Sequence, residues 1–163
     1  MTLKIETLSR DGFAPFGSYL DPEDCGPPRR AGALEFHPDT FIMRFPTSNV
    51  LSACSLTVKP RPMVVDVTET HLETEEIIGG FGAELAFHVG LSRQGEPLEP
   101  DMSTFRIFRL PAGWYARFKR GVYHHGPFVT GEKPAHGLVL LPPVTYSADC
   151  IVVKLDQPIA IEN

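Results

Sequence analysis

Apolar residues recur along this chain in short runs that are rich in β-branched and aromatic side chains. Clusters of proline, glycine and charged residues separate the runs, which follow one another at the spacing typical of a β-sandwich or barrel. Each run is long enough for one strand and too short for a helix of several turns. The runs predicted to form strands span residues 51–58, 63–67, 84–91, 104–110, 114–118, 137–141 and 150–155.

Proline and glycine are distributed along the whole sequence and leave little room for long helices. The chain holds 16 prolines and 14 glycines, and both residue types interrupt helices. The one segment that favours a helix is 9–16, where Ser9 can cap one or two turns. With no repeat and no low-complexity segment, the sequence predicts a single all-β domain over residues 1–163, a barrel or jelly roll with at most short helices.

Composition narrows the classes of partner. The 163 residues carry a formal net charge of -5, which disfavours a nucleic-acid surface. No apolar run has the length of a membrane span, and the first residues lack the apolar centre of a signal peptide. The widely spaced Cys25, Cys54 and Cys150 form no C-x2-C pair, as expected of reduced thiols. The sequence therefore predicts a cytoplasmic protein with neither a nucleic-acid nor a membrane partner.

Two short motifs combine histidines and carboxylates. The first reads E-x-H-x3-E and contains Glu69, His71 and Glu75, and the second reads G-x5-K-x-G-x2-H and ends at His124. Residues two apart on a strand point to the same face, and Glu75 can join the first pair after a short turn. Two imidazoles and two carboxylates brought together across a barrel can bind a divalent transition metal. We therefore expect Glu69, His71, Glu75 and His124 to be the ligands, with Glu76 facing solvent.

These motifs resemble the paired signatures of the cupin superfamily, G-x5-H-x-H-x3,4-E-x6-G and G-x5-P-x-G-x2-H-x3-N. Glu69 stands in place of the first histidine, and Lys119 in place of the proline. The resemblance implies a cupin-type double-stranded β-helix in which the four candidate ligands point into the mouth of the barrel. The matching positions are His71, Glu75, Gly82, Gly113, Gly121 and His124.

A narrower resemblance is to the ureidoglycolate lyases. Segments 101–104 (DMST) and 121–128 (GVYHHGPF) resemble the family's D-L-S-T and G-V-W-H-H-P-L, segment 11–17 resembles its opening element, and the family shares E-x-H at 69–71. The resemblance implies a metal-dependent homodimeric enzyme of purine catabolism, in allantoin degradation, that converts ureidoglycolate to glyoxylate and urea. The chain departs from the family at Glu75, where the family has glutamine, and in the residues 77–80 that follow, and it lacks the family's Asp-Arg pair within 137–143.

Cleavage of ureidoglycolate requires that its hydroxyl lose a proton and that the departing nitrogen gain one. Lys119 is the first candidate for the acid or base, followed by Tyr123 and His125, and an anionic substrate could be held by Arg117 or Lys59. Mixed histidine and carboxylate ligands suit Ni, Mn, Fe or Zn, and the sequence does not choose among them.

Two other functions remain open from the sequence. One is a different cupin enzyme, such as a sugar-acid isomerase or a dioxygenase, that uses the same four ligands on another small anion. The other is a non-catalytic barrel that binds a small ligand, which retention of all four ligand types disfavours. The apolar segment 41–43 could form the surface of a homodimer, or equally an internal strand. His88, between two apolar residues of a predicted strand, is expected to be buried and hydrogen-bonded.

Overall fold

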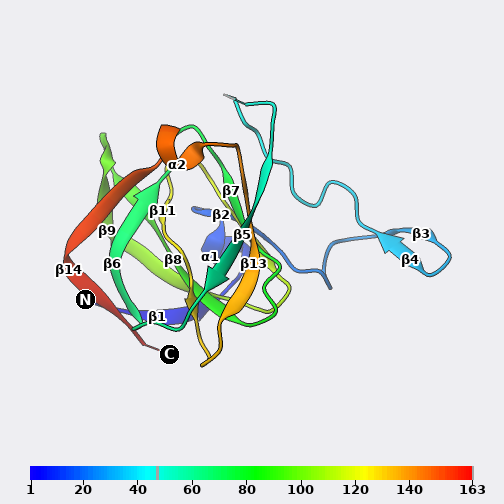
Figure 1. Cartoon of the computed structure of the whole chain (residues 1–163), viewed down its shortest axis with the longest axis horizontal. Coiled ribbons are helices and arrows are strands. Elements are labelled where there is room, and N and C mark those ends of the chain that lie inside the picture. The colour runs from blue at the N-terminus through cyan, green and yellow to red at the C-terminus, as the bar shows by residue number, and fades with distance from the viewer. Residues whose placement is uncertain (47, 163) are drawn as a thin grey trace.

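Backbone pairing joins six strands into a closed ring in the computed structural model, which describes residues 1–46 and 48–162 (Figure 1). Neighbours around the ring are β11 (Tyr123–His124), β6 (Val64–Thr70), β14 (Ile151–Glu162), β1 (Thr2–Thr7), β9 (Glu96–Leu110) and β8 (Leu85–Arg93). The ring closes because β8 also pairs with β11. The short strand β12 (Phe128–Val129) pairs with β8 beside this closure.

A second sheet of five antiparallel strands faces the ring. Its order is β2 (Gly17–Leu20), β10 (Tyr115–Phe118), β7 (Glu76–Gly79), β13 (Ala135–Leu141) and β5 (Ser52–Val58). A separate hairpin of β3 (Arg29–Ala31) and β4 (Leu34–Phe36) stands away from the barrel (Figure 1). The two helices, α1 (Arg10–Phe13) and α2 (Thr145–Ala148), have a single turn each.

The first helix forms where the sequence predicts it. Ser9 has an extended backbone, and its hydroxyl accepts a hydrogen bond from the Gly12 N–H at 3.1 Å, which caps the helix. The helix ends after one turn, and Phe13 and Phe16 enter the core between the sheets. This short element therefore anchors the N-terminal segment to the barrel.

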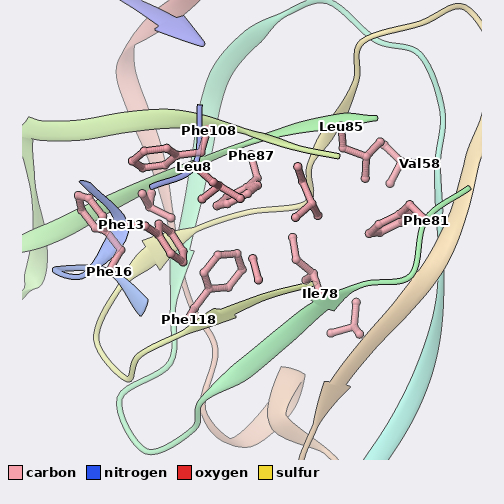
Figure 2. Packing of buried hydrophobic residues seen from close by; sticks show 14 of the residues in the cluster. Leu8, Phe13, Phe16, Val58, Ile78, Phe81, Leu85, Phe87, Phe108 and Phe118 are labelled. Atoms are coloured by element: carbon pink, nitrogen blue, oxygen red, sulfur yellow. The ribbon is translucent and has the colours of Figure 1, made fainter. Parts of the chain in front are cut away.

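The core consists of two apolar clusters, one on each face of the ring strands. The cluster between the sheets is built around aromatic rings (Figure 2), with Phe13 against Phe108 at 5.4 Å between ring centroids. The other cluster comes from ring strands together with β12 and includes Tyr123 and Phe105. On β8, Leu85, Phe87 and Val89 belong to the first cluster and Ala86 to the second, as expected when successive side chains of a strand alternate between faces.

The structure confirms the all-β barrel with only short helices. Each of the seven apolar runs overlaps a strand. Two strands extend well beyond their apolar run, since β9 begins at Glu96 and β14 continues to Glu162. Strands outside the predicted runs include β1 and β7.

Residues 41–43 do not form a strand, although Phe41 and Met43 line an apolar hollow on the outer face of the second sheet. The predicted homodimer remains a prediction. Among the described residues, no helix is long and apolar enough to cross a membrane. Cys25, Cys54 and Cys150 are free thiols.

Candidate metal centre

Three of the four predicted ligands lie together. Glu69 belongs to β6, His71 follows the end of that strand, and His124 on β11 is the direct antiparallel partner of Glu69. One side-chain ligand atom from each of these residues lies within 4.8 Å of the other two. Both imidazoles are buried, with ring centroids 5.2 Å apart, and Glu69 is half-buried.

Glu76, rather than Glu75, is the second carboxylate at the histidines. Its Oε2 lies 3.2 Å from Nε2 of His71 and 3.7 Å from Nε2 of His124. Glu76 is only 5% exposed, so the expectation that it faces solvent is wrong. The carboxylate of Glu75 instead accepts a hydrogen bond from the Arg44 N–H at 3.2 Å.

Strand register explains the difference between the two glutamates. In the pairing of β7 with β10, Glu76 lies opposite Phe118, and directly paired residues project from the same face of a sheet. The ring of Phe118 packs against His124 at 4.5 Å between centroids, so this face is the one that carries the histidines. Glu75, one residue earlier, is on the opposite side, where it lies 3.8 Å from Arg117.

Backbone carbonyls fix the orientation of both imidazoles. Nδ1 of His71 donates to the Asp149 carbonyl at 2.5 Å, and Nδ1 of His124 donates to the Val122 carbonyl at 2.9 Å. A carbonyl oxygen can only accept, so in each neutral ring the lone pair is on Nε2. Both Nε2 atoms are buried, and in this tautomer they find no hydrogen-bond donor within the described part of the chain, because the polar group beside them is the ionised carboxylate of Glu76, which can only accept. Such a pair of atoms requires an explanation, and a metal ligated by Nε2 provides one.

The charges in this cluster depend on one another. Burial would raise the pKa of Glu76, but His124 and His71 outweigh burial and lower it to about 2. Burial would likewise lower the pKa of His71, yet Glu76, the Asp149 carbonyl and Glu69 together raise it. The site thus stabilises a buried carboxylate next to positive charge.

The donor set fits a transition metal. Two ligands of one ion, each about 2.1 Å from it, are separated by roughly 3 to 4.2 Å, and the contacts of Glu76 with the two histidines, 3.2 and 3.7 Å, fall in that range. Imidazole and carboxylate donors suit Zn, Mn, Fe or Ni. Glu69, His71, Glu76 and His124 are therefore the residues that could hold a metal.

The segment after β13 closes one side of the cluster and was not anticipated from the sequence. The carboxylate of Asp149 accepts hydrogen bonds from the Leu72 and Glu73 N–H groups at 2.8 and 2.9 Å, which holds the turn that follows His71. The Cys150 thiol donates to Glu69 at 3.3 Å. These residues belong to no recognisable motif, and pairing of β14 with β6 brings them to the site.

Tyr146, on α2, is a further residue near the cluster. Tyr146 is 60% exposed, but partial burial of its hydroxyl, with the carboxylates of Glu76 and Glu69, raises the pKa of Tyr146 to about 12. Burial and the same Glu69 raise the pKa of Cys150 to about 12. The raised pKa values make both groups weaker acids, so at physiological pH they act as hydrogen-bond donors that keep their protons.

Buried His88 supports His124 from the other face of the sheet. Its Nε2 donates to the Thr68 hydroxyl at 3.1 Å, and that hydroxyl donates to the His124 carbonyl, also at 3.1 Å. Burial lowers the pKa of His88 well below its ordinary value, so the ring is neutral. The expectation that His88 is buried and hydrogen-bonded is confirmed.

Two of the three predicted catalytic residues are not brought to the metal cluster. Tyr123 is fully buried in the cluster of ring strands, and its hydroxyl donates to the Pro97 carbonyl at 3.4 Å. It follows that Tyr123 projects from the face opposite to His124, its neighbour on the strand. The ammonium of Lys119 donates to the Ala14 carbonyl at 2.5 Å, beside helix α1.

His125, the third catalytic candidate, lies just beyond the end of β11, so strand alternation does not fix the direction of its side chain. It is half-buried, and burial lowers its pKa while the Glu69 carboxylate opposes that shift. Of the two predicted substrate-binding residues, Lys59 is exposed just beyond β5. Arg117 projects from the outer face of the second sheet, where its Nη1 donates to the Ile42 carbonyl at 2.7 Å.

Comparison with known proteins gives little beyond the fold. No family model matches the chain, and no curated protein matches it. Among solved structures, oxalate decarboxylase from Bacillus subtilis, a cupin, matches with a TM-score of 0.37. Identity is 14% in a structure described for its Mn(II) centres and 16% in a structure at pH 4.6. Each match covers 68% of this chain and 23% of the decarboxylase.

The chain thus spans less than a quarter of the decarboxylase's length. A TM-score of 0.37 is too low to indicate a shared function. The resemblance to ureidoglycolate lyases remains a prediction from the sequence.

Proposed function

We propose that this protein is a metal-dependent enzyme that acts on a small carboxylate, with ureidoglycolate, cleaved to glyoxylate and urea, as the substrate. The observation that carries the metal dependence is the pair of buried Nε2 lone pairs of His71 and His124, which face a carboxylate and find no hydrogen-bond donor among the described residues. Glu76 and Glu69 supply carboxylate oxygens beside them. The named substrate rests on the sequence resemblance.

In this proposal the residues of the cluster have two roles, which are to hold the metal ion and to orient its ligands. Glu69, His71, Glu76 and His124 would hold the ion, whose chemistry is to lower the pKa of a coordinated hydroxyl and to stabilise negative charge on oxygen. The Asp149 carbonyl keeps the His71 ring in the tautomer that ligation requires. Such fixed orientation limits the rearrangement that the site undergoes during the reaction.

We assign the proton acceptor to His125. It follows His124 directly and is half-buried. Burial lowers its pKa, which favours the neutral ring that a proton acceptor needs, and the Glu69 carboxylate opposes that shift. The proton that His125 accepts from the hydroxyl is then returned to the departing nitrogen, and Tyr146, whose pKa the same carboxylates raise, is the hydrogen-bond donor that we assign to orienting that nitrogen. We do not assign these roles to Lys119 or Tyr123, because each donates to a carbonyl group elsewhere.

The test is glyoxylate release from racemic ureidoglycolate by chelator-stripped protein reloaded separately with Mn, Ni and Zn. We expect release with at least one metal and its loss in His124→Ala. His136→Ala is the matched control, because His136 is exposed and its hydrogen bond is to Thr57 of β5 in the second sheet. Failure to bind any of the metals would refute the proposal. Metal binding without release would refute ureidoglycolate as the substrate.

A further inference from the structure

A polar hollow lies next to the metal cluster and is separate from it. Its volume is about 530 Å³, within the range of small-molecule sites. None of the four candidate ligands lines it. The lining residues are Leu72, Glu75, Arg117, Lys119, Arg120 and Gly121.

The hollow carries an excess of positive charge. Three of its lining residues are cationic and one is acidic. Within the part of the chain that the structure describes, the only ion pair among them joins Arg117 to Glu75, at 3.8 Å. Lys119 bonds to neutral carbonyl groups, and Arg120 is exposed without a hydrogen bond or ion pair among the described residues. Two positive charges therefore remain uncompensated, on a chain whose net charge is -5.

Arg117 is held in place and retains donors. The Ile42 carbonyl accepts from its Nη1 at 2.7 Å, which fixes the guanidinium. Its Nε is buried, but the side chain is 23% exposed and lines the hollow, so its remaining Nη–H groups are the donors that a ligand can reach. A guanidinium with unused donors in a fixed position matches the oxygens of phosphate or carboxylate groups.

We propose that this hollow binds a small molecule through a dianionic group, either a phosphate monoester or a dicarboxylate. Arg117, Lys119 and Arg120 supply the charge, and Arg117 supplies directed hydrogen bonds. The site differs from the metal cluster, and its occupation requires no metal. It also gives a role to two residues, Arg117 and Lys119, that the sequence had assigned to the active site.

The hollow and the metal cluster share one turn of the chain. Leu72 directly follows His71, and Glu75 directly precedes Glu76. The Gly121 N–H donates to the His71 carbonyl at 2.7 Å. The backbone amides of Leu72 and Gly121 are therefore suitable reporters for a ligand in the hollow.

The experiment is a titration of chelator-stripped protein at constant ionic strength, followed by ¹H–¹⁵N NMR. The probes are inorganic phosphate, malonate as a dicarboxylate, and acetate as a monoanion. We expect saturable shifts of the Leu72 and Gly121 amides and of the Arg117 Nε–H with phosphate or malonate, and none with acetate. The stronger of the two dianions identifies which ligand class the hollow prefers.

Two variants locate the site. Arg120→Gln removes an exposed, unpaired cation, and we expect it to weaken binding about tenfold or more. Lys133→Gln removes an exposed cation from a turn outside the hollow and should change affinity by less than about twofold. His124→Ala should leave the titration unchanged.

Three results would overturn this proposal. They are the absence of saturable shifts, equal weakening by the Arg120 and Lys133 variants, and loss of anion binding in His124→Ala. The last result would place the anion at the metal cluster. Because the titration uses metal-free protein, its outcome is independent of whether the proposed enzymatic function is correct.

Discussion

Neighbouring glutamates with different surroundings allow a matched test of the metal centre. Glu76→Gln preserves the size of the side chain but removes the charge that lies 3.2 Å from Nε2 of His71. Glu75→Gln makes the same chemical change one residue earlier, at a carboxylate bound to the Arg44 N–H. If Glu76 is a metal ligand and Glu75 is not, only the first variant should lose metal affinity.

The expected magnitude follows from the position of Glu76 between the two imidazoles. Loss of a group that merely orients a metal ligand costs about 10- to 100-fold in affinity, and loss of a ligand itself should reach the upper end of that range. We expect Glu76→Gln to weaken binding about 100-fold, which corresponds to roughly 2.8 kcal/mol. An amide oxygen still ligates weakly, so binding should not vanish. Glu75→Gln should stay within about twofold of the parent.

The assay is competition between the chelator-stripped protein and a chromophoric chelator, performed separately with Mn, Ni and Zn. Thermal unfolding gives a second readout, because an ion that binds only the folded state at 100 times its Kd stabilises that state by about 2.7 kcal/mol. Unfolding without metal shows whether each variant is folded. Equal affinities of the Glu75 and Glu76 variants, or a larger loss for Glu75→Gln, would refute our assignment.

Three further changes test the surroundings of the site. Asp149→Ala removes the carboxylate that holds the turn after the first histidine, and metal affinity measured by the same competition should fall about 10-fold or more. In Gly79→Ala the new Cβ would lie 2.3 Å from the Tyr115 ring, so chemical denaturation should show a loss of about 1–3 kcal/mol. The hydrogen bond from Arg106, against a smaller effect of burial, lowers the pKa of Glu6. The stabilisation of the fold by the ionised Glu6 beside Arg106 is therefore fully present above pH 4.5 and is lost as the pH falls through the lowered pKa of Glu6. Glu6→Gln should cost at most about 1 kcal/mol at neutral pH and less in acid, and a loss that grows in acid would contradict this sign.

The barrel could be predicted from the sequence because most of its strands bury one face. Alternating burial leaves apolar runs, and each run proved to overlap a strand. The first half of β9 was missed because its residues are mostly polar and exposed, and they are held by pairing such as that of Leu91 with Asp101. Strand pairing between residues that are far apart in the sequence leaves no local pattern from which the strand could be predicted.

The candidate site was predicted to the extent that it is local. Glu69 and His71 lie on one strand and its end, and His124 completes a recognisable spacing. Asp149 and Cys150 come from the far end of the chain, and only the pairing of β14 with β6 places them beside Glu69. No spacing rule reaches across about 80 residues to a strand without a motif of its own.

The choice between two adjacent glutamates depends on where β7 begins, because a shift of one residue moves every side chain of a strand to the opposite face. Pairing of Glu76 with Phe118 directs Glu76 to the histidines, and it directs Glu75 and Arg117 to the outer hollow. The register of β7 with β10 therefore places the carboxylate that can bind a metal on one face of the sheet and Arg117, which can bind an anion, on the other. Deletion of one residue from the turn after His71 would move Glu76 to the outer face and bring Ile77 to the position that faces the histidines, so it should impair the metal centre and change the surroundings of the hollow together. The length of this turn is thus a determinant of both sites.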